Sequence, residues 1–179
     1  MTYRLLISLV CFFLVIPLSY ANWSTPVSAW GRVNMQGAII ETACAIDTQS
    51  RDQTIDMGVL PISQIARDGR GLAHDFAVQL VQCSLTRHNS SLKNWQHFKI
   101  TFDGQNDSGL FSINGQAKGV ALEIIDSNGF VASPGNPLPV SNILSGNMQL
   151  NYSLRLVSNK QALRPGNYSS ALRFKMDYY

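Results

Sequence analysis

The chain has 179 residues, of which 45% are hydrophobic and only 14% are charged, and its formal net charge is +3. This length suits one well-packed domain and is short for two. The mild charge balance gives no reason to expect a nucleic-acid partner, and the many Ser, Asn and Gln residues are typical of an extracellular β-protein with a polar surface.

The first segment, 1–21, predicts a secretory signal peptide. Arg4 precedes an apolar run over 5–16, and the small residues Ser19 and Ala21 stand where a signal peptidase reads the chain. The apolar run is shorter than the roughly 20 residues that a membrane-spanning helix needs. We therefore expect cleavage after Ala21 and a soluble mature chain over 22–179.

The cysteines predict one disulfide. Cys11 would leave with the signal peptide, so the mature chain keeps Cys44 and Cys83. In an oxidising compartment an even pair favours a disulfide, although two unpaired buried thiols are the alternative. Closing this loop would stabilise the fold by at most about 4 kcal/mol on the chain-entropy estimate.

Short alternating or apolar runs, separated by clusters of Gly, Asn, Pro and Ser, predict strands in the rest of the chain. We expect them over 33–46 (broken near Thr42), 54–57, 75–83, 97–102, 119–125, 148–157 and 167–178. The segment 61–71 is expected to be a loop with at most a short helix, because Gly69 and Gly71 would end it. This spacing favours an all-β fold, an antiparallel two-sheet sandwich of immunoglobulin type.

The last strand predicts an unfilled place in that sandwich. Its apolar and polar residues alternate, with Leu172, Phe174, Met176 and Tyr178 on one face and Arg173, Lys175 and Asp177 on the other. A strand with one apolar face and a free edge needs a neighbour. We expect this neighbour to come from another molecule, because no later segment of the chain can supply it.

The sequence gives little support for an enzyme. It contains no Gly-x-Ser-x-Gly elbow, no His-Glu-x-x-His motif and no cysteine–histidine cluster around His74, His88 or His97. Three aspartates in turns, Asp103, Asp107 and Asp126, lack the spacing of a calcium loop. We expect no catalytic residue, metal, cofactor or small-molecule substrate.

Several short motifs, taken in order behind a signal peptide, resemble one known family. They are the run 37–47 that leads through Cys44, the stretch 54–58, Cys83 at the end of a strand, Gly166, and the penultimate aromatic residue Tyr178. Over essentially the whole mature chain the sequence is similar to the pilin subunits of fimbriae assembled by the chaperone–usher route.

This resemblance implies an incomplete immunoglobulin-like sandwich over 37–179 that lacks its last strand. A periplasmic pilus chaperone would fill the resulting groove first, holding the C-terminal carboxylate with basic residues. At the outer-membrane usher, the N-terminal extension of another fimbrial subunit would then replace the chaperone strand, a form of β-strand addition. The fold would thus be completed by a strand in trans, and the protein would pass through the periplasm to the fimbrium on the bacterial cell surface, where it would support adhesion.

The resemblance also assigns roles to residues. The segment 22–36 would be the donor strand, with Val27, Ala29, Gly31, Val33 and Met35 on its inward face. A disordered tail or an ordinary first strand is the alternative for this segment. The acceptor groove and chaperone-binding strand would contain Gly166, Tyr168, Leu172, Phe174, Met176, Tyr178 and Tyr179.

Loop sequences favour a minor subunit over an abundant rod pilin. The stretches 101–104, 114–119 and 166–168 are most similar to the termination and anchor subunit of P pili. The chain has no room for the additional binding domain of an adhesin.

A second class of function fits the composition as well. A self-contained, secreted carbohydrate-binding sandwich would use Trp30 or Trp95 to stack on a sugar. Such a domain would be stable alone, whereas a pilin without its chaperone would aggregate or be degraded.

Overall fold

The computed structural model of the protein describes residues 30–179. The chain divides into a short N-terminal unit that ends at Ala38 and a body over Ile39–Tyr179, and each is described by itself. The described part of the first unit, 30–38, has no helix or strand. The predicted signal peptide, together with Val27 and Ala29, lies outside the described residues.

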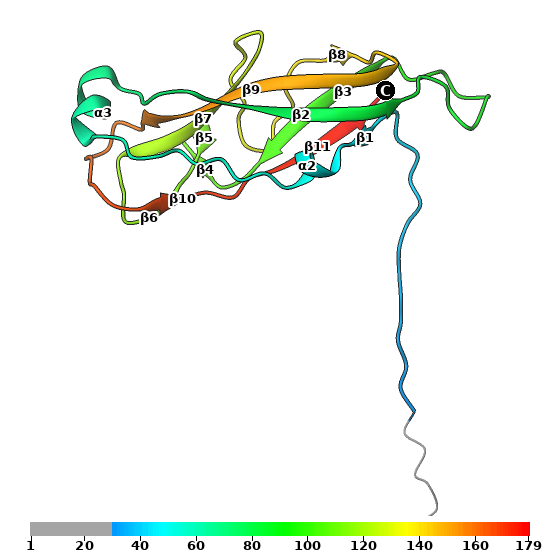
Figure 1. The fold of residues 1–179 in the computed structure, drawn as a ribbon, viewed down its shortest axis with the longest axis horizontal. Helices are drawn as coiled ribbons and strands as arrows, with labels where there is room; N and C mark the ends of the chain where they lie inside the picture. The colour runs from blue at the N-terminus through cyan, green and yellow to red at the C-terminus, as the bar shows by residue number, and fades with distance from the viewer. Residues whose placement is uncertain (1–29) are drawn as a thin grey trace, which may run out of the picture. The chain divides into compact units, whose positions relative to one another are not determined.

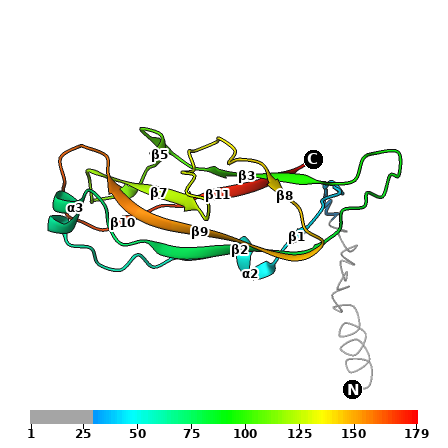
Figure 2. The same ribbon diagram turned by 90° about the horizontal axis from the view of Figure 1, so that it is seen from above.

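The body is built almost entirely from antiparallel strands (Figure 1). They are β1 (Ala45–Ile46), β2 (His74–Cys83), β3 (His97–Asp103), β4 (Asn106–Asp107), β5 (Leu110–Phe111), β6 (Asn114–Gly115), β7 (Val120–Asp126), β8 (Ser141–Asn142), β9 (Gly146–Ser158), β10 (Tyr168–Ser169) and β11 (Arg173–Tyr178). Six strands form one sheet in the order β1-β2-β9-β7-β5-β4, three form a second in the order β11-β3-β8, and β10 pairs with β6. Figure 2 shows β3 and β11 as a layer apart from β2 and β9.

The alternation of apolar residues along these strands explains why the two layers pack together. Val78 and Leu80 of β2 are fully buried. Ile100 of β3 and Leu154 of β9 are only 3% and 7% exposed. Successive side chains of a strand point to opposite faces, so these positions all turn toward one core. The predicted two-sheet antiparallel sandwich therefore has its apolar faces inside.

The predicted disulfide is present. It joins Cys44 to Cys83, the last residue of β2, with 4.1 Å between the two Cα atoms. Both cysteines are buried within the core. The bond ties the segment before β1 to the end of β2, beside the place where β1 pairs with β2.

Two short helices interrupt the strands. The helix α2 (Thr48–Arg51) begins at Asp47, whose side chain accepts a hydrogen bond from the Gln49 amide. The helix α3 (Ile62–Asp68) ends at Gly69, which takes a left-handed conformation with φ of 70°. Sequence reasoning expected at most a short helix here and did not expect α2. None of the helices within residues 30–179 is long and apolar enough to cross a membrane.

Three of the predicted strands differ from the observed ones. Of 33–46 only β1 is a strand, and 54–57 pairs with no other strand in the described part of the chain. The predicted strand 167–178 is divided into β10 and β11, because its first part pairs with β6 and its second part with β3. Alternation predicts an extended backbone, but a strand also requires a hydrogen-bonded neighbour.

Candidate functional site

The body contains a mainly apolar groove of about 1310 Å³. One wall is the coil between α2 and α3, cyan in Figure 1, and the other is the segment 163–174 that runs through β10 into β11, brown to red in the same view. The floor between the walls is made of apolar side chains from both sheets: Phe76, Phe102, Val120, Leu122, Ile124, Leu154 and Leu156.

The first wall is an extended segment whose backbone has no partner. Along it Ile55 and Met57 are partly buried against the core, whereas Asp56 and Val59 are exposed. Within residues 53–60 no backbone group bonds to another backbone group of the described chain, and the Gly58 amide bonds only to the Asp56 side chain. This wall therefore has the side-chain pattern of a strand and an unpaired edge.

The second wall also has an unpaired edge. The strand β11 pairs with β3 over six residue pairs, from Arg173 opposite Asp103 to Tyr178 opposite Phe98, and with no other strand of residues 30–179. Its first two residues, Arg173 and Phe174, line the groove, so the unpaired edge of β11 begins there. An unpaired edge beside an apolar floor is a template for one further strand.

Gly166 fixes the path of the second wall. A Cβ atom at this position would lie 2.5 Å from the Cβ of Gln116 and 2.8 Å from the Ala117 amide nitrogen. No larger residue fits without a shift of the backbone. The sequence singled out this glycine, and the structure gives it a packing reason.

Tyr168 contributes a polar atom to the same wall. Its hydroxyl is buried and has no hydrogen-bond partner among the described residues. Burial, with the nearby Asp56 carboxylate as a second cause, raises the pKa of Tyr168 above the usual value for a phenol.

An aromatic cluster lies at the β11 end of the groove. The ring of Phe102 packs against Phe174 at 6.1 Å between ring centres and against Tyr152 at 5.1 Å, and Phe76 stacks on Tyr152 at 5.4 Å. Edge-to-face and offset contacts of this kind are favourable for aromatic side chains. Burial raises the pKa of Tyr152 far above its ordinary value.

Four of the predicted acceptor residues line the groove and three do not. Gly166, Tyr168, Leu172 and Phe174 line it. Met176 and Tyr178 pack against the core beyond the groove. Tyr179 is 53% exposed and extends the pairing with β3, since its amide donates to the His97 carbonyl and its own carbonyl accepts from Gln96.

Sequence reasoning missed the first wall as part of the site. It predicted a strand over 54–57 but did not place it opposite the last strand. The alternation of Ile55 and Met57 was a signal for an apolar face, and nothing in the sequence indicated which segment this face would meet.

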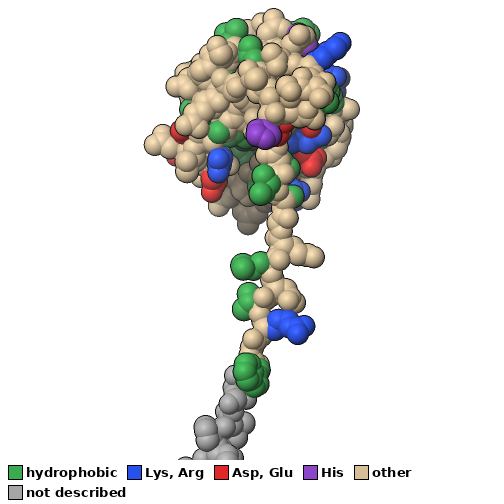
Figure 3. Space-filling view, turned by 90° about the vertical axis from the view of Figure 1, so that its right-hand side faces the viewer, with side chains coloured by type: hydrophobic (Ala, Val, Ile, Leu, Met, Phe, Trp, Pro, Cys, Tyr) green, Lys and Arg blue, Asp and Glu red, His purple; other side chains and the backbone are tan. Residues whose placement is uncertain are grey.

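The predicted donor residues that the structure describes are exposed. Val33 and Met35 are 85% and 89% exposed, and a Cβ at Gly31 would meet no atom within 4 Å. Hydrophobic side chains follow one another along this segment in the space-filling view (Figure 3). Exposed apolar side chains at alternate positions are compatible with a strand that pairs elsewhere, and the donor role stays a prediction.

The two tryptophans proposed for sugar stacking differ in access. Trp30 is 94% exposed, but Trp95 is only 8% exposed. The Arg87 guanidinium lies 3.4 Å from the centre of the Trp95 ring system, and Tyr178 contacts it edge-on at 6.1 Å. Trp95 is thus occupied within the fold and has no free face for a sugar.

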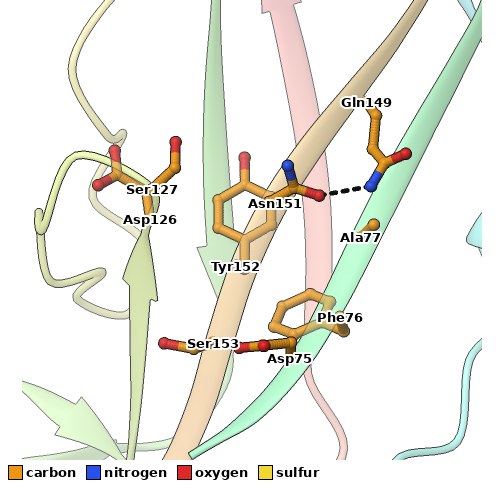
Figure 4. A pocket seen from close by; sticks show the side chains of 9 residues that line it. All are labelled: Asp75, Phe76, Ala77, Asp126, Ser127, Gln149, Asn151, Tyr152 and Ser153. Atoms are coloured by element: carbon orange, nitrogen blue, oxygen red, sulfur yellow. Dashed lines mark hydrogen bonds between the residues drawn. The ribbon is translucent and has the colours of Figure 1, made fainter.

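A second, smaller hollow of about 470 Å³ lies over β2 and β9 and is lined by both polar and apolar residues (Figure 4). Its lining includes Asp75, Gln149 and Asn151. These residues alternate with the buried core residues along β2 and β9, so their side chains lie on the opposite face of the sheet. The Gln149 amide donates to the Asn151 side chain at 2.6 Å. No group of three or more metal-binding side chains occurs within residues 30–179, here or elsewhere.

Comparisons with known proteins agree on one family. The family described as fimbrial protein matches residues 33–179. The chain is 31% identical over 150 residues to the PRS fimbrial minor pilin protein and to the PAP fimbrial minor pilin protein, both of Escherichia coli, covering 83% of this chain and 77% of each relative. It is 28% identical to the major MR/P fimbria protein of Proteus mirabilis, covering 83% of both chains.

Among solved structures, the P pilus rod subunit PapA has the same fold. It superposes with a TM-score of 0.67 at 23% identity, covering 77% of this chain and all of PapA. A chaperone–usher pilus structure gives a TM-score of 0.67 at 24% identity, covering 87% and 99% of the two chains. The predicted incomplete immunoglobulin-like sandwich is thereby confirmed, and the chain belongs to the fimbrial protein family, as a subunit of the chaperone–usher type.

Proposed function

We propose that the protein is a structural minor subunit of a chaperone–usher fimbria, assembled by donor-strand complementation and exchange. One observation carries the proposal: an apolar groove lies between the extended segment 53–60, whose backbone has no backbone partner in the described chain, and the segment 163–174, which leads into the unpaired edge of β11. A strand placed between them would pair its backbone with the walls and set alternate side chains on the apolar floor.

The open groove explains why partners are needed. Unpaired edges beside exposed apolar surface lead to aggregation, so a subunit in the periplasm requires a temporary strand. A periplasmic chaperone would supply it and hold the carboxylate of Tyr179. The outer-membrane usher would then be the place where the strand of another subunit enters.

The segment 22–36 is the strand that this chain would give to a neighbour. Its apolar positions alternate with polar ones, and Gly31 would allow close passage over the receiving backbone. The predicted donor face is Val27, Ala29, Gly31, Val33 and Met35.

Within the fimbria we assign the chain to a minor position that terminates or anchors the fibre. The 31% identity to the PRS and PAP minor pilin proteins supports a minor role. The protein would be secreted through the periplasm to the fimbrium at the cell surface, where it would support adhesion as a structural part without catalysis.

Co-expression tests the proposal. The mature chain is produced in the periplasm with and without a pilus chaperone from the same fimbrial system, and the purified complex is challenged with a donor-strand peptide from a neighbouring subunit. We expect soluble protein only with the chaperone. A complex that resists the peptide identifies a terminating subunit, and one that exchanges identifies an internal subunit. A stable monomer formed without the chaperone would contradict the proposal.

A further inference from the structure

We infer that the groove takes a strand from a different chain that carries an acidic side chain over Lys118 and Arg164, and that it disfavours the tail of a second copy of this protein. The inference rests on the proposed function, because it specifies which strand the groove accepts. It comes from the charges along the groove walls and not from their apolar floor.

Lys118 and Arg164 form a pair of like charges at the groove. Their backbones bond to each other in both directions, at 3.1 Å and 3.0 Å, and both residues line the groove. Both are exposed, and no salt bridge joins either to a carboxylate of residues 30–179. Like charges placed directly opposite each other are unfavourable, and a carboxylate close to both would relieve this.

The pair marks one end of the groove. A Cβ at Gly119 would lie 2.8 Å from the Leu163 Cα, so the backbone next to Lys118 lies against the start of the second wall. At the other end of that wall, Arg173 of β11 is paired in register with Asp103, and on the first wall Arg51 is followed by Asp52. No salt bridge within residues 30–179 joins Arg51 or Arg173 to a carboxylate either, and the first wall carries the carboxylates of Asp52 and Asp56. What sets Lys118 and Arg164 apart is that two like charges lie directly opposite each other at one end of the groove.

The tail of this chain has the wrong charge for that end. Residues 22–36 include Arg32 and contain no Asp or Glu. A second copy that inserted this tail would add a cation and no carboxylate to a groove whose lining already has four cationic side chains and only two carboxylates. The fold thus contains a charge-based obstacle to self-polymerisation, which suits a subunit present in few copies.

The test uses the mature full-length chain, unfolded in urea and refolded with synthetic peptides of residues 22–36. The probes are the natural peptide and four variants with Ser28→Glu, Asn34→Glu, Ser28→Lys or Asn34→Lys, which place charge near either end on the outward-facing positions. The readout is the peptide concentration that gives half-maximal folded, peptide-bound protein. Refolding avoids any barrier to chaperone exchange.

At low salt, we expect one of the two Glu peptides to give half-maximal folding at about three-fold lower concentration than the natural peptide, as for exposed ion pairs. This is the Glu peptide whose charge lies at the Lys118 end. The matching Lys peptide should need a higher concentration. The gain should disappear with Lys118→Gln plus Arg164→Gln and shrink at high salt. It should persist with the control Lys93→Gln, because Lys93 is exposed and does not line the groove.

The outcomes separate the two proposals. If the peptides support folding but neither Glu variant gains, or if the gain survives in the Lys118→Gln, Arg164→Gln protein, the charge inference is wrong and the groove assignment stands. If no peptide supports folding at any concentration, both the groove assignment and the charge inference are overturned.

Discussion

Phe174 on β11 and Phe102 on β3 are direct cross-strand partners whose ring centres lie 6.1 Å apart, and both side chains line the groove. The pair connects the last strand of the chain to the floor of the groove. Whatever strand enters beside β11 must therefore cover Phe174, and this contact can be tested directly.

Phe174→Asp should abolish capture by the chaperone. The substitution places a carboxylate in the apolar groove, where an entering strand would bury it without a partner at a cost of several kcal/mol. We expect at least a ten-fold lower yield of co-purified complex. The matched control is Lys175→Asp, the next residue, which is exposed and points away from the groove. Capture that is normal in the Phe174→Asp protein would contradict the groove assignment.

Met176→Asp offers a finer comparison along the same strand. Met176 is on the same face as Phe174 but packs against the core beyond the groove. Because the sequence analysis places Met176 in the acceptor groove, its substitution would be expected to abolish capture as well. The structure assigns that loss to weaker core packing, so the Met176→Asp protein refolded with a donor peptide should show a lower urea midpoint with the peptide affinity retained.

Gly166→Ala should destabilise the peptide-completed protein by about 1–3 kcal/mol, because the added Cβ would overlap Gln116 and force the wall to shift. The free energy of unfolding in urea measures the effect. Gly37→Ala is the control, since a Cβ there would meet no atom within 4 Å. Equal stability of the two variants would show that the close approach at Gly166 does not constrain the wall.

The parts of the structure that follow from local pattern were predictable. Alternation in β2, β3, β9 and β11 fixes which residues are buried, and the cysteine pair fixes the disulfide. Pairing between distant segments was not predictable in the same way. Residues 54–57 alternate like a strand yet pair with no strand of residues 30–179, and the opposition of Lys118 and Arg164 depends on a long-range contact that no local pattern encodes.

Ionisation of buried tyrosines should make the completed protein sensitive to base. Burial raises the pKa of Tyr152 in the fold above its unfolded value near 10. The folded state therefore keeps a proton that the unfolded state loses, and the stabilisation present below pH 10 is lost as the pH rises above it. Tyr152→Phe should unfold at a higher pH than the natural protein. Since Tyr178 also has a raised pKa but is only partly buried, Tyr178→Phe gives a matched comparison with a smaller expected effect.

Gly31→Leu should block the transfer of the tail to a neighbouring subunit and leave chaperone capture intact. Gly31 lies in the predicted donor strand, where a Leu side chain would collide with the backbone of the receiving groove, whereas in the free subunit a Cβ at Gly31 meets no atom within 4 Å. We expect normal yields of the chaperone complex and loss of the variant from assembled fimbriae, measured by immunoblot of sheared fibres. The control is Asn34→Leu, which adds similar bulk to the outward face and should still be incorporated. If the Gly31→Leu subunit enters fibres at the natural level, the segment 22–36 is not inserted in the proposed register.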